Sequence, residues 1–260
     1  PSEGDIEVAL QSASTTHEAA YWAPLLSHSP MEPVNAVVSI QGDEADVWTG
    51  IQFPSAVPGL VSRVADIPAE NVRFHQTYLG GGFGRRGTPS HIVEATEIAK
   101  TTGKPIQLVW TREDDIQQGP FRPASLMRIK AGVDSGGNLI AWDAARAGAD
   151  ISPDTFRSLL PALYSWMGDG MVEGVANLSE WYFEKFATDE SSTEGLFDDY
   201  DQPNTRVIHM TVDHELPMTF WRSVGHSYTA FAKESMIDEM AEAAGMDEVA
   251  FRLQNTQNAP

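Results

Sequence analysis

A glycine-rich stretch at residues 78–89, YLGGGFGRRGTP, carries the strongest signal for chemistry in this sequence. Glycine adopts positive φ angles without strain and lets backbone N–H groups approach a ligand closely, as in loops that bind phosphate or oxo groups. Arg85 and Arg86 would add positive charge, and a helix that begins near Pro89 would add the positive end of its dipole. The stretch therefore predicts a site for an anionic ligand, with a tight strand-to-helix connection that binds nothing as the alternative.

Residues 82–87 also match G-x-G-x-x-G, the pattern of dinucleotide-binding loops. Such loops need an acidic residue about 20 positions further on, where this sequence reads TGKPIQ and has none. The sequence downstream predicts a β-hairpin instead of another βαβ unit, and no Lys-Ser or Lys-Thr pair closes the loop as in a P-loop. A dinucleotide-binding fold and a P-loop are therefore both disfavoured, and the pattern leaves the anionic ligand open.

Other polar residues are weaker candidates. His209 and His214, with Asp213 between them, have the composition of a metal site, but their spacing on a strand would turn the two imidazoles to opposite faces of a sheet. Glu32, in the motif MEP, would either face an active site or serve in a turn. The acidic stretch at 189–201 has the pattern of a solvated loop. None of these residues predicts a metal site.

The composition excludes several classes of protein. With 37 acidic against 17 basic residues, the formal charge of -20 would repel nucleic acid and anionic membranes. The absence of cysteine excludes disulfides, thiolate zinc sites and iron–sulfur clusters from this chain, so electron transfer would need another subunit. No run approaches the roughly 20 apolar residues of a membrane span, and no signal peptide is expected, which leaves the bacterial cytoplasm and periplasm both open.

The glycine-rich stretch at residues 78–89, here named the glycine loop, is expected to lie between a strand and a helix. Residues 71–79 have the pattern of a strand, and the helix is predicted from Thr88, as N-cap, and Pro89, as first helical residue, to Gly103. The N-terminus of this helix would face the glycine loop. The other elements predicted nearby are a hairpin of residues 36–40 with 46–50, a short helix within 55–67 and a buried strand at 106–110.

The rest of the chain alternates between strand and helix patterns. The segment 150–204 has no period, because its aromatic, glycine and acidic residues alternate irregularly, and it is expected to form irregular surface. The elements predicted outside it are a hairpin of residues 126–134 with 138–146, a strand at 205–214, an amphipathic helix at 227–245 and a short helix at 246–255 capped by Asp247. The fold class is therefore α+β, with possible subdomains at 1–150 and 151–260.

Several motifs in order along the chain carry a family resemblance. They are HSPMEP at 28–33, GGGFGRR at 80–86, LVWTREDD at 108–115, GPFRPA at 119–124 and FWRSVGHSYTAFAKESMIDEMAEAAG at 220–245. Together they resemble the molybdenum-binding subunit of the xanthine dehydrogenase and aldehyde oxidase family, in particular the isoquinoline 1-oxidoreductase beta subunit type. The resemblance runs from about Tyr21 to Asn255. It implies that residues 1–260 are a fragment of the molybdopterin-binding region of a molybdenum hydroxylase, with the mixed strands and helices of that domain.

The resemblance implies roles for individual residues. Gln52, in TGIQFP, matches a glutamine that hydrogen-bonds a molybdenum oxo group in this family, whereas taken alone it has the character of an ordinary surface amide. Arg222 matches an arginine near the cofactor or substrate pocket, whereas taken alone it has the character of a buried ion-pair partner. The loop residues implied to bind the cofactor are Gly81, Gly82, Phe83, Gly84 and Arg85. No side chain is expected to bind the molybdenum directly.

The sequence departs from the purine-oxidising members of the family at two places. Their loop continues with Gly-Lys-Glu, where this chain has Arg85, Arg86 and Gly87. Val224 stands where those members have a stacking phenylalanine. The resemblance therefore implies an aldehyde or a different N-heterocycle as the substrate, oxidised with oxygen derived from water.

The glutamate that acts as general base in this family lies in a late motif similar to GVGEPG, which this chain does not contain. The isolated chain is therefore expected to be inactive and to hold little or no cofactor, whereas the full-length protein would bind molybdopterin, in the cytosine dinucleotide form. Its partners would be the remainder of its own polypeptide and an iron–sulfur subunit or another electron acceptor. The alternative is a non-catalytic binding or assembly domain derived from the same family.

Overall fold

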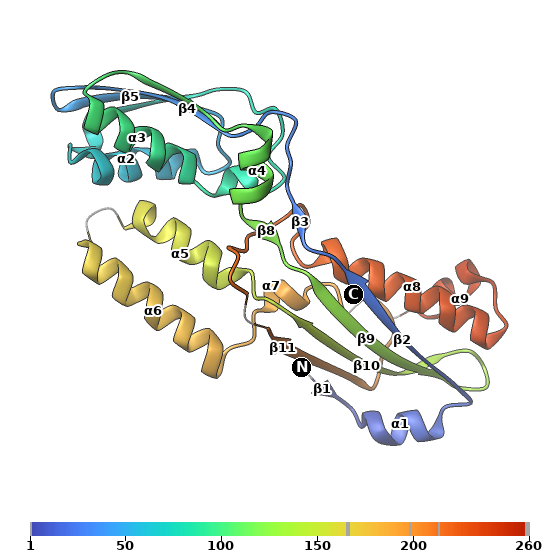
Figure 1. The fold of residues 1–260 in the computed structure, drawn as a ribbon. Helices are drawn as coiled ribbons and strands as arrows, with labels where there is room; N and C mark the ends of the chain where they lie inside the picture. Colours follow the sequence, from blue (N-terminus) through green and yellow to red (C-terminus); the bar gives the residue numbers. More distant parts are fainter. Residues whose placement is uncertain (1, 165–166, 198, 213, 258–260) are drawn as a thin grey trace.

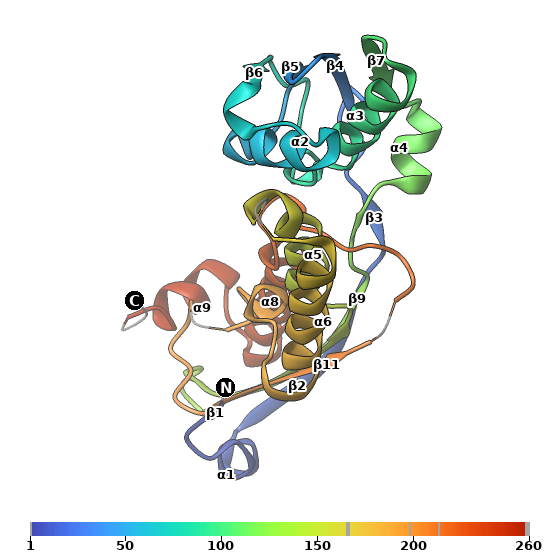
Figure 2. The same ribbon diagram turned by 90° about the vertical axis from the view of Figure 1, so that its left-hand side faces the viewer.

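The computed structural model describes residues 2–164, 167–197, 199–212 and 214–257. They form two units, each a sheet with helices packed on it, joined by a two-stranded ribbon (Figure 1). In the orientation of Figure 2 the two units lie one above the other, with the ribbon along one side. None of the described helices is long and apolar enough to cross a membrane.

The larger unit is built on a five-stranded sheet in the order β1-β11-β10-β9-β2. Its strands are β1 (Ser2–Glu3), β2 (Thr15–Ala23), β9 (Ser125–Val133), β10 (Leu139–Gly148) and β11 (Thr205–Thr211). Neighbouring strands are antiparallel except β10 and β11, which run parallel.

Helices cover both faces of this sheet. On one face α8 (His226–Ala244) adds Met236 to a core that also contains Ile129 and Trp142, and α9 (Glu248–Gln254) adds Phe251 to the same core. On the other face α1 (Ile6–Ser12) contacts Ala141. Ala141 and Trp142 reach different cores because successive residues of a strand point to opposite faces.

The smaller unit holds the glycine loop. Its sheet, in the order β6-β5-β4-β7, consists of β4 (Asn35–Gln41), β5 (Glu44–Thr49), β6 (Val72–Gln76) and β7 (Ile106–Val109). The helices α2 (Val57–Ala65) and α3 (Ser90–Thr102) cover one face, where Val38 and Val47 meet Leu60 and Ile92 in a common core. The remaining elements are α4 (Arg112–Gln118) and short helical turns at Pro54–Ala56, Ala69–Asn71 and Arg85–Gly87.

The ribbon between the units consists of β3 (Leu26–Ser27) and β8 (Phe121–Arg122), which pair antiparallel. The chain leaves the larger sheet after β2, builds the smaller unit and returns through β8 to β9 (Figure 1). The expected subdomain boundary at residue 150 does not separate the two units. The strands β10 and β11 lie on either side of it in the sequence but are neighbours in one sheet.

The expectation of irregular surface for residues 150–204 is wrong. This segment contains α5 (Ser152–Leu163), α6 (Asp169–Phe186) and α7 (Glu190–Thr193). The first two helices lie side by side, with Leu160, Val172 and Ala176 buried between them (Figures 1 and 2). Pro161 inside α5 and the glycines inside α6 interrupt the helical pattern, so tertiary packing stabilises these helices where propensity is weak.

The other predicted elements are confirmed, with shifts at their ends, except that the strand at 106–110, expected to be buried, is the edge strand β7 with Val109 56% exposed. The helix after the glycine loop has Pro89 as its N-cap, one residue later than predicted, and ends at Gly103 with a left-handed φ of 63°. Thr88 does not cap this helix because its hydroxyl accepts a hydrogen bond from Nη1 of Arg85 and donates one to the carbonyl oxygen of the same residue. Asp247 caps α9 as predicted, since its carboxylate accepts hydrogen bonds from two backbone N–H groups of the first turn.

Candidate cofactor-binding site

The glycine loop leaves β6 after Gln76 and reaches α3 through the turn at Arg85–Gly87. Gly84 has a φ of 102°, and a Cβ atom at this position would lie 1.8 Å from the carbonyl oxygen of Phe220, so only glycine fits. Phe83 has a φ of 53°, a left-handed conformation that costs a residue with a side chain about 1–2 kcal/mol. Its ring is half exposed. Backbone strain of this kind is concentrated at ligand sites.

Gln52 is held against the loop at two points. Its backbone N–H donates to the carbonyl oxygen of Arg86 at 2.8 Å, and its side-chain Oε1 accepts a hydrogen bond from the N–H of Gly84 at 3.0 Å. Because the N–H of Gly84 can only bind an acceptor, the oxygen of the Gln52 amide must face Gly84, and the NH₂ group at the other end remains as a donor. This NH₂ group has no acceptor within the part of the chain that the structure describes.

The loop backbone also presents donors. The N–H groups of Gly80 and Gly84 are bound by side chains, and that of Arg85 by the carbonyl oxygen of Gly82. The three N–H groups between them, at residues 81–83, have no acceptor among the described residues. Consecutive unbound N–H groups in a concave loop are a common arrangement for binding anions.

Arg222 lies beside Phe83, although the two residues are far apart in the sequence. Its backbone N–H donates to the carbonyl oxygen of Phe83 at 2.9 Å. Its side chain is exposed and has no carboxylate partner among residues 2–164, 167–197, 199–212 and 214–257. The adjacent Ser223 and Val224 are both left-handed, with φ of 62° and 52°. The predicted site residues Gln52, Gly82, Phe83, Gly84 and Arg222 are thus brought together.

Arg85 and Arg86 do not offer their charges at the loop surface, and this part of the expectation is corrected. Their exposed fractions are 1% and 0%. Arg85 donates to Thr88 Oγ1 at 2.9 Å, lies 3.4 Å from the Asp115 carboxylate and stands over the ring of Trp110. The loop packs on the interior of the smaller unit here, so both guanidinium groups lie inside the protein, each in an ion pair with a carboxylate.

Glu32, left open between a role in an active site and one in a turn, supports the loop through hydrogen bonds. Its carboxylate accepts hydrogen bonds from the N–H of Gly80 at 2.8 Å and from Arg86 at 2.7 Å. Burial opposes ionisation of Glu32, but hydrogen bonds from Asn35 and Gly80 and the charge of Arg86 outweigh it and hold its pKa below the usual value. The carboxylate is therefore an anionic support of the loop.

Sequence reasoning missed His28, a buried imidazole between the loop and the ribbon. Its Nδ1 lies 3.1 Å from the carbonyl oxygen of Pro120 and its Nε2 lies 2.8 Å from that of Phe220, beside Gly84. Burial lowers the pKa of His28, against the effect of the two carbonyl oxygens. The signal that points to this residue is its place at the start of the motif HSPMEP.

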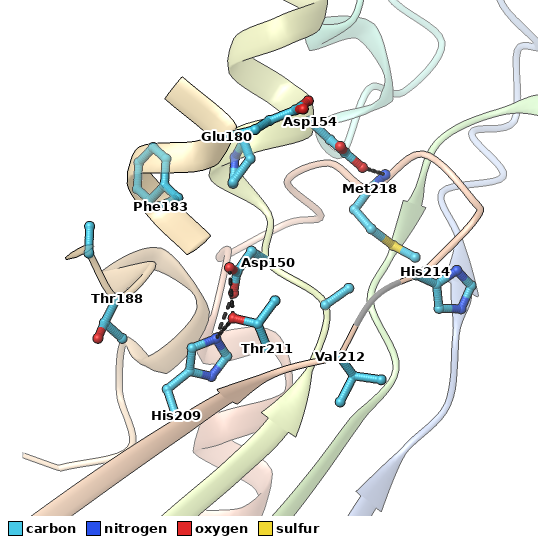
Figure 3. Close-up of a pocket in the computed structure, with 13 residues that line it drawn as sticks. Asp150, Asp154, Glu180, Phe183, Thr188, His209, Thr211, Val212, His214 and Met218 are labelled. Atoms are coloured by element: carbon cyan, nitrogen blue, oxygen red, sulfur yellow. Dashed lines mark hydrogen bonds and ion pairs between the residues drawn. The ribbon is translucent and has the colours of Figure 1, made fainter. Parts of the chain in front are cut away.

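A separate polar cavity of about 730 Å³ lies in the larger unit, beside α5, α6 and β11 (Figure 3). His209 and His214 both line it, because β11 ends at Thr211 and His214 lies beyond the strand. His209 Nε2 donates to Asp150 at 2.6 Å, and its Nδ1 lies 3.3 Å from a guanidinium nitrogen of Arg146, so both ring nitrogens are occupied. The described residues contain no cluster of metal-binding side chains, and Asp213 lies outside them.

The groups gathered at the glycine loop form a set of hydrogen-bond donors. They are the N–H groups of residues 81–83 and the NH₂ group of Gln52, and the backbone of the exposed Arg222 lies next to them. Such a set binds phosphate and metal-oxo oxygens, since these are acceptors and carry negative charge. It contains no thiolate, imidazole or carboxylate to bind a metal ion directly, so a metal at this place would be held through its own ligands.

Comparison with known proteins identifies relatives of this chain. The family model of the molybdopterin cofactor-binding domain matches residues 1–150 and 181–256. The isoquinoline 1-oxidoreductase subunit beta of Brevundimonas diminuta is 30% identical over 91% of this chain and 28% of that subunit. The aldehyde oxidoreductase molybdenum-binding subunit of Escherichia coli (strain K12) is 27% identical over 97% of this chain and 30% of that subunit.

A solved structure gives the same fold. Quinoline 2-oxidoreductase from Pseudomonas putida 86 matches with a TM-score of 0.75 and 18% identity, over 98% of this chain and 30% of that one. The α+β class is confirmed. This chain spans less than a third of the length of these relatives. With the family model covering most of the sequence and the donor set of the loop suited to its cofactor, the chain belongs to the molybdopterin cofactor-binding domain family.

Proposed function

We propose that this chain is a segment of the molybdenum-binding subunit of a molybdenum hydroxylase, and that its glycine loop binds part of the molybdopterin. The orientation of Gln52 is the observation that carries the proposal. Because the N–H of Gly84 occupies the amide oxygen at 3.0 Å, the NH₂ group is left to donate beside the loop. An amide held in this way binds an acceptor such as an oxo group.

The residues of the site have separable tasks. When bound, molybdopterin supplies the redox centre at which a substrate carbon is oxidised with oxygen from water. Gln52 donates to an oxo group of this cofactor, and the N–H groups of Gly82 and Phe83 donate to its oxygen atoms. Arg222 offsets the negative charge of the cofactor in a chain whose formal charge is -20. Donors fixed before reaction stabilise the charge that develops in the transition state.

The substrate is proposed to be an aldehyde or an N-heterocycle, as the names of the isoquinoline, aldehyde and quinoline oxidoreductases indicate for those relatives. The cofactor is proposed to be the cytosine dinucleotide form. Because this chain has no cysteine, electrons would leave through an iron–sulfur subunit or another acceptor. The general base would come from the remainder of the polypeptide.

The proposal is tested on the intact polypeptide that carries this chain, with Gln52→Ala and the control Gln107→Ala. Gln107 is exposed on β7 and should be replaceable without effect. Turnover per bound molybdenum, followed by dye reduction with aldehydes and N-heterocycles, should fall about 10²–10³-fold in Gln52→Ala. Equal turnover in Gln52→Ala and the wild type would contradict the role of Gln52. A wild-type polypeptide without molybdenum would favour the non-catalytic binding domain.

A further inference from the structure

The guanidinium group of Arg86 is fully buried and binds three separate segments around the glycine loop. Its Nε donates to the carbonyl oxygen of Gly81 at 3.0 Å, and its Nη1 donates to that of Gly50 at 2.9 Å. Its Nη2 donates to the carboxylate of Glu32 at 2.7 Å and to the backbone oxygen of the same residue at 3.1 Å. One side chain thus ties the loop to the segments before β4 and after β5.

Glu32 supplies the charge that this burial requires. A buried arginine without a partner is strongly destabilising, and the ion pair with Glu32 compensates the charge of Arg86. Glu32 also binds the backbone of Gly80 in both directions, as acceptor from its N–H at 2.8 Å and as donor to its carbonyl oxygen at 3.0 Å. A Cβ atom on Gly80 would lie 2.4 Å from the Cβ of Glu32, so the two segments are in direct contact.

The same arginine fixes the backbone at Gln52. The carbonyl oxygen of Arg86 accepts a hydrogen bond from the N–H of Gln52 at 2.8 Å, while its guanidinium group binds the carbonyl oxygen of Gly50. The Gln52 side chain then reaches the N–H of Gly84. We infer that Arg86 and Glu32 are positioning residues that set the orientation of the Gln52 amide against the loop. The inference rests on the proposed function only where it concerns turnover.

The geometry of the contacts requires arginine. A guanidinium group is a rigid planar fork of donors, whereas lysine carries a single nitrogen on a flexible stem. Lysine at residue 86 would keep the positive charge beside Glu32, but it would not reach the oxygens of Gly50 and Gly81 at the same time. Arg86→Lys therefore removes the positioning contacts while it keeps the charge.

The test is residue-resolved hydrogen exchange on the intact polypeptide, in Arg86→Lys and the matched control Arg73→Lys. Arg73 lies exposed on β6 and pairs with Glu44 and Asp46, away from the loop contacts. In Arg86→Lys the exchange of the Gly84 N–H should rise about tenfold, with the exchange of the α3 amides unchanged. Turnover per bound molybdenum should fall in the same variant, and Arg73→Lys should match the wild type in both measurements.

An unchanged exchange rate at Gly84 would overturn the inference, and so would a rise that α3 shares, because that result indicates general unfolding. If Arg86→Lys does not fold, Glu32→Gln decides, since its amide oxygen still accepts from the N–H of Gly80, whereas the charge beside Arg86 and the acceptor for Asn35 are lost. Faster exchange at both Gly80 and Gly84 supports the inference, and an unchanged rate at Gly84 contradicts it. If the wild-type polypeptide contains no molybdenum, the proposed function is refuted. The exchange rates at Gly80 and Gly84 still test the positioning role in that case, because they do not depend on the cofactor.

Discussion

The N–H of Gly84 donates a hydrogen bond of 3.0 Å to the side-chain oxygen of Gln52, which lies 32 residues earlier in the chain. This bond joins the glycine loop to the segment after β5 and determines which end of the Gln52 amide is available to a ligand. The loop and Gln52 therefore act as one structural unit. A change at Gly84 should alter both the stability of the smaller unit and the orientation of Gln52.

Gly84→Ala should destabilise the protein strongly. The new Cβ atom would lie 1.8 Å from the carbonyl oxygen of Phe220, at a φ of 102° that residues with a side chain rarely adopt. We expect the free energy of unfolding to fall by about 3 kcal/mol or more, as measured by urea denaturation.

The matched control for this change is Gly42→Ala in the turn between β4 and β5. Gly42 has a φ of 62°, but its Cβ atom would meet no atom within 4 Å. Gly42→Ala should therefore introduce only backbone strain, which lowers the free energy of unfolding by about 1–2 kcal/mol. Equal losses in Gly42→Ala and Gly84→Ala would show that Gly84 does not pack against Phe220.

His91 should make the fold sensitive to mild acid. Burial, followed by the positive charges of Arg85 and Arg86, lowers the pKa of His91 to about 3, so the imidazole is neutral in the folded protein. The unfolded chain takes up a proton below the ordinary histidine pKa, so stability is fully present above pH 6.5 and falls as the pH drops from 6.5 toward 3. Between pH 7 and pH 5 the titration of His91 should lower the free energy of unfolding by about 2 kcal/mol.

The measurement compares urea denaturation at pH 7 and pH 5 in the wild type and in His91→Gln, which has a side chain that does not titrate. All other ionisable groups are common to the two proteins, so the difference between their pH dependences isolates His91. His91→Gln should be less stable at pH 7 and should lose less stability on acidification. Parallel losses in the two proteins would show that folding does not lower the pKa of His91.

The isolated chain should contain little or no molybdenum and should not reduce dye with any aldehyde or N-heterocycle. It spans less than a third of its relatives and leaves large apolar side chains near the loop exposed, with exposed fractions of 89% for Met31, 50% for Phe53 and 100% for Tyr78. General-base catalysis alone contributes about 10²–10⁴ in rate, and the matching glutamate motif is absent here.

Metal analysis together with dye reduction checks this expectation, with the intact polypeptide as the control. Fluorescence of an apolar dye should also be higher with the isolated chain, because exposed apolar surface binds such dyes. Stoichiometric molybdenum with measurable turnover in the isolated chain would show that the active site lies wholly within these residues.

Elements formed by residues close together in the sequence could be predicted from local patterns. Pro89 and Gly103 cap the two ends of the helix after the loop. Such capping residues can be recognised from the sequence because they act on the first or last turn of the helix next to them. The hairpin of β9 and β10 follows from alternating apolar residues on either side of a glycine turn. The site residues Gln52 and Arg222 came from the family resemblance, since neither residue type has a local signature for binding.

Contacts between distant segments decided the remaining features. Arg85 and Arg86 have the same local sequence whether they face a ligand or the interior, and their direction depends on Asp115 and Glu32, which arrive from other segments. The helices α5 and α6 are stabilised by apolar side chains, such as Leu160, that are buried between them. The spacing of apolar residues within either segment does not predict this burial. The pairing of β10 with β11 likewise joins strands separated by these helices, because strand partners are selected by the burial of a shared face and not by short-range pattern.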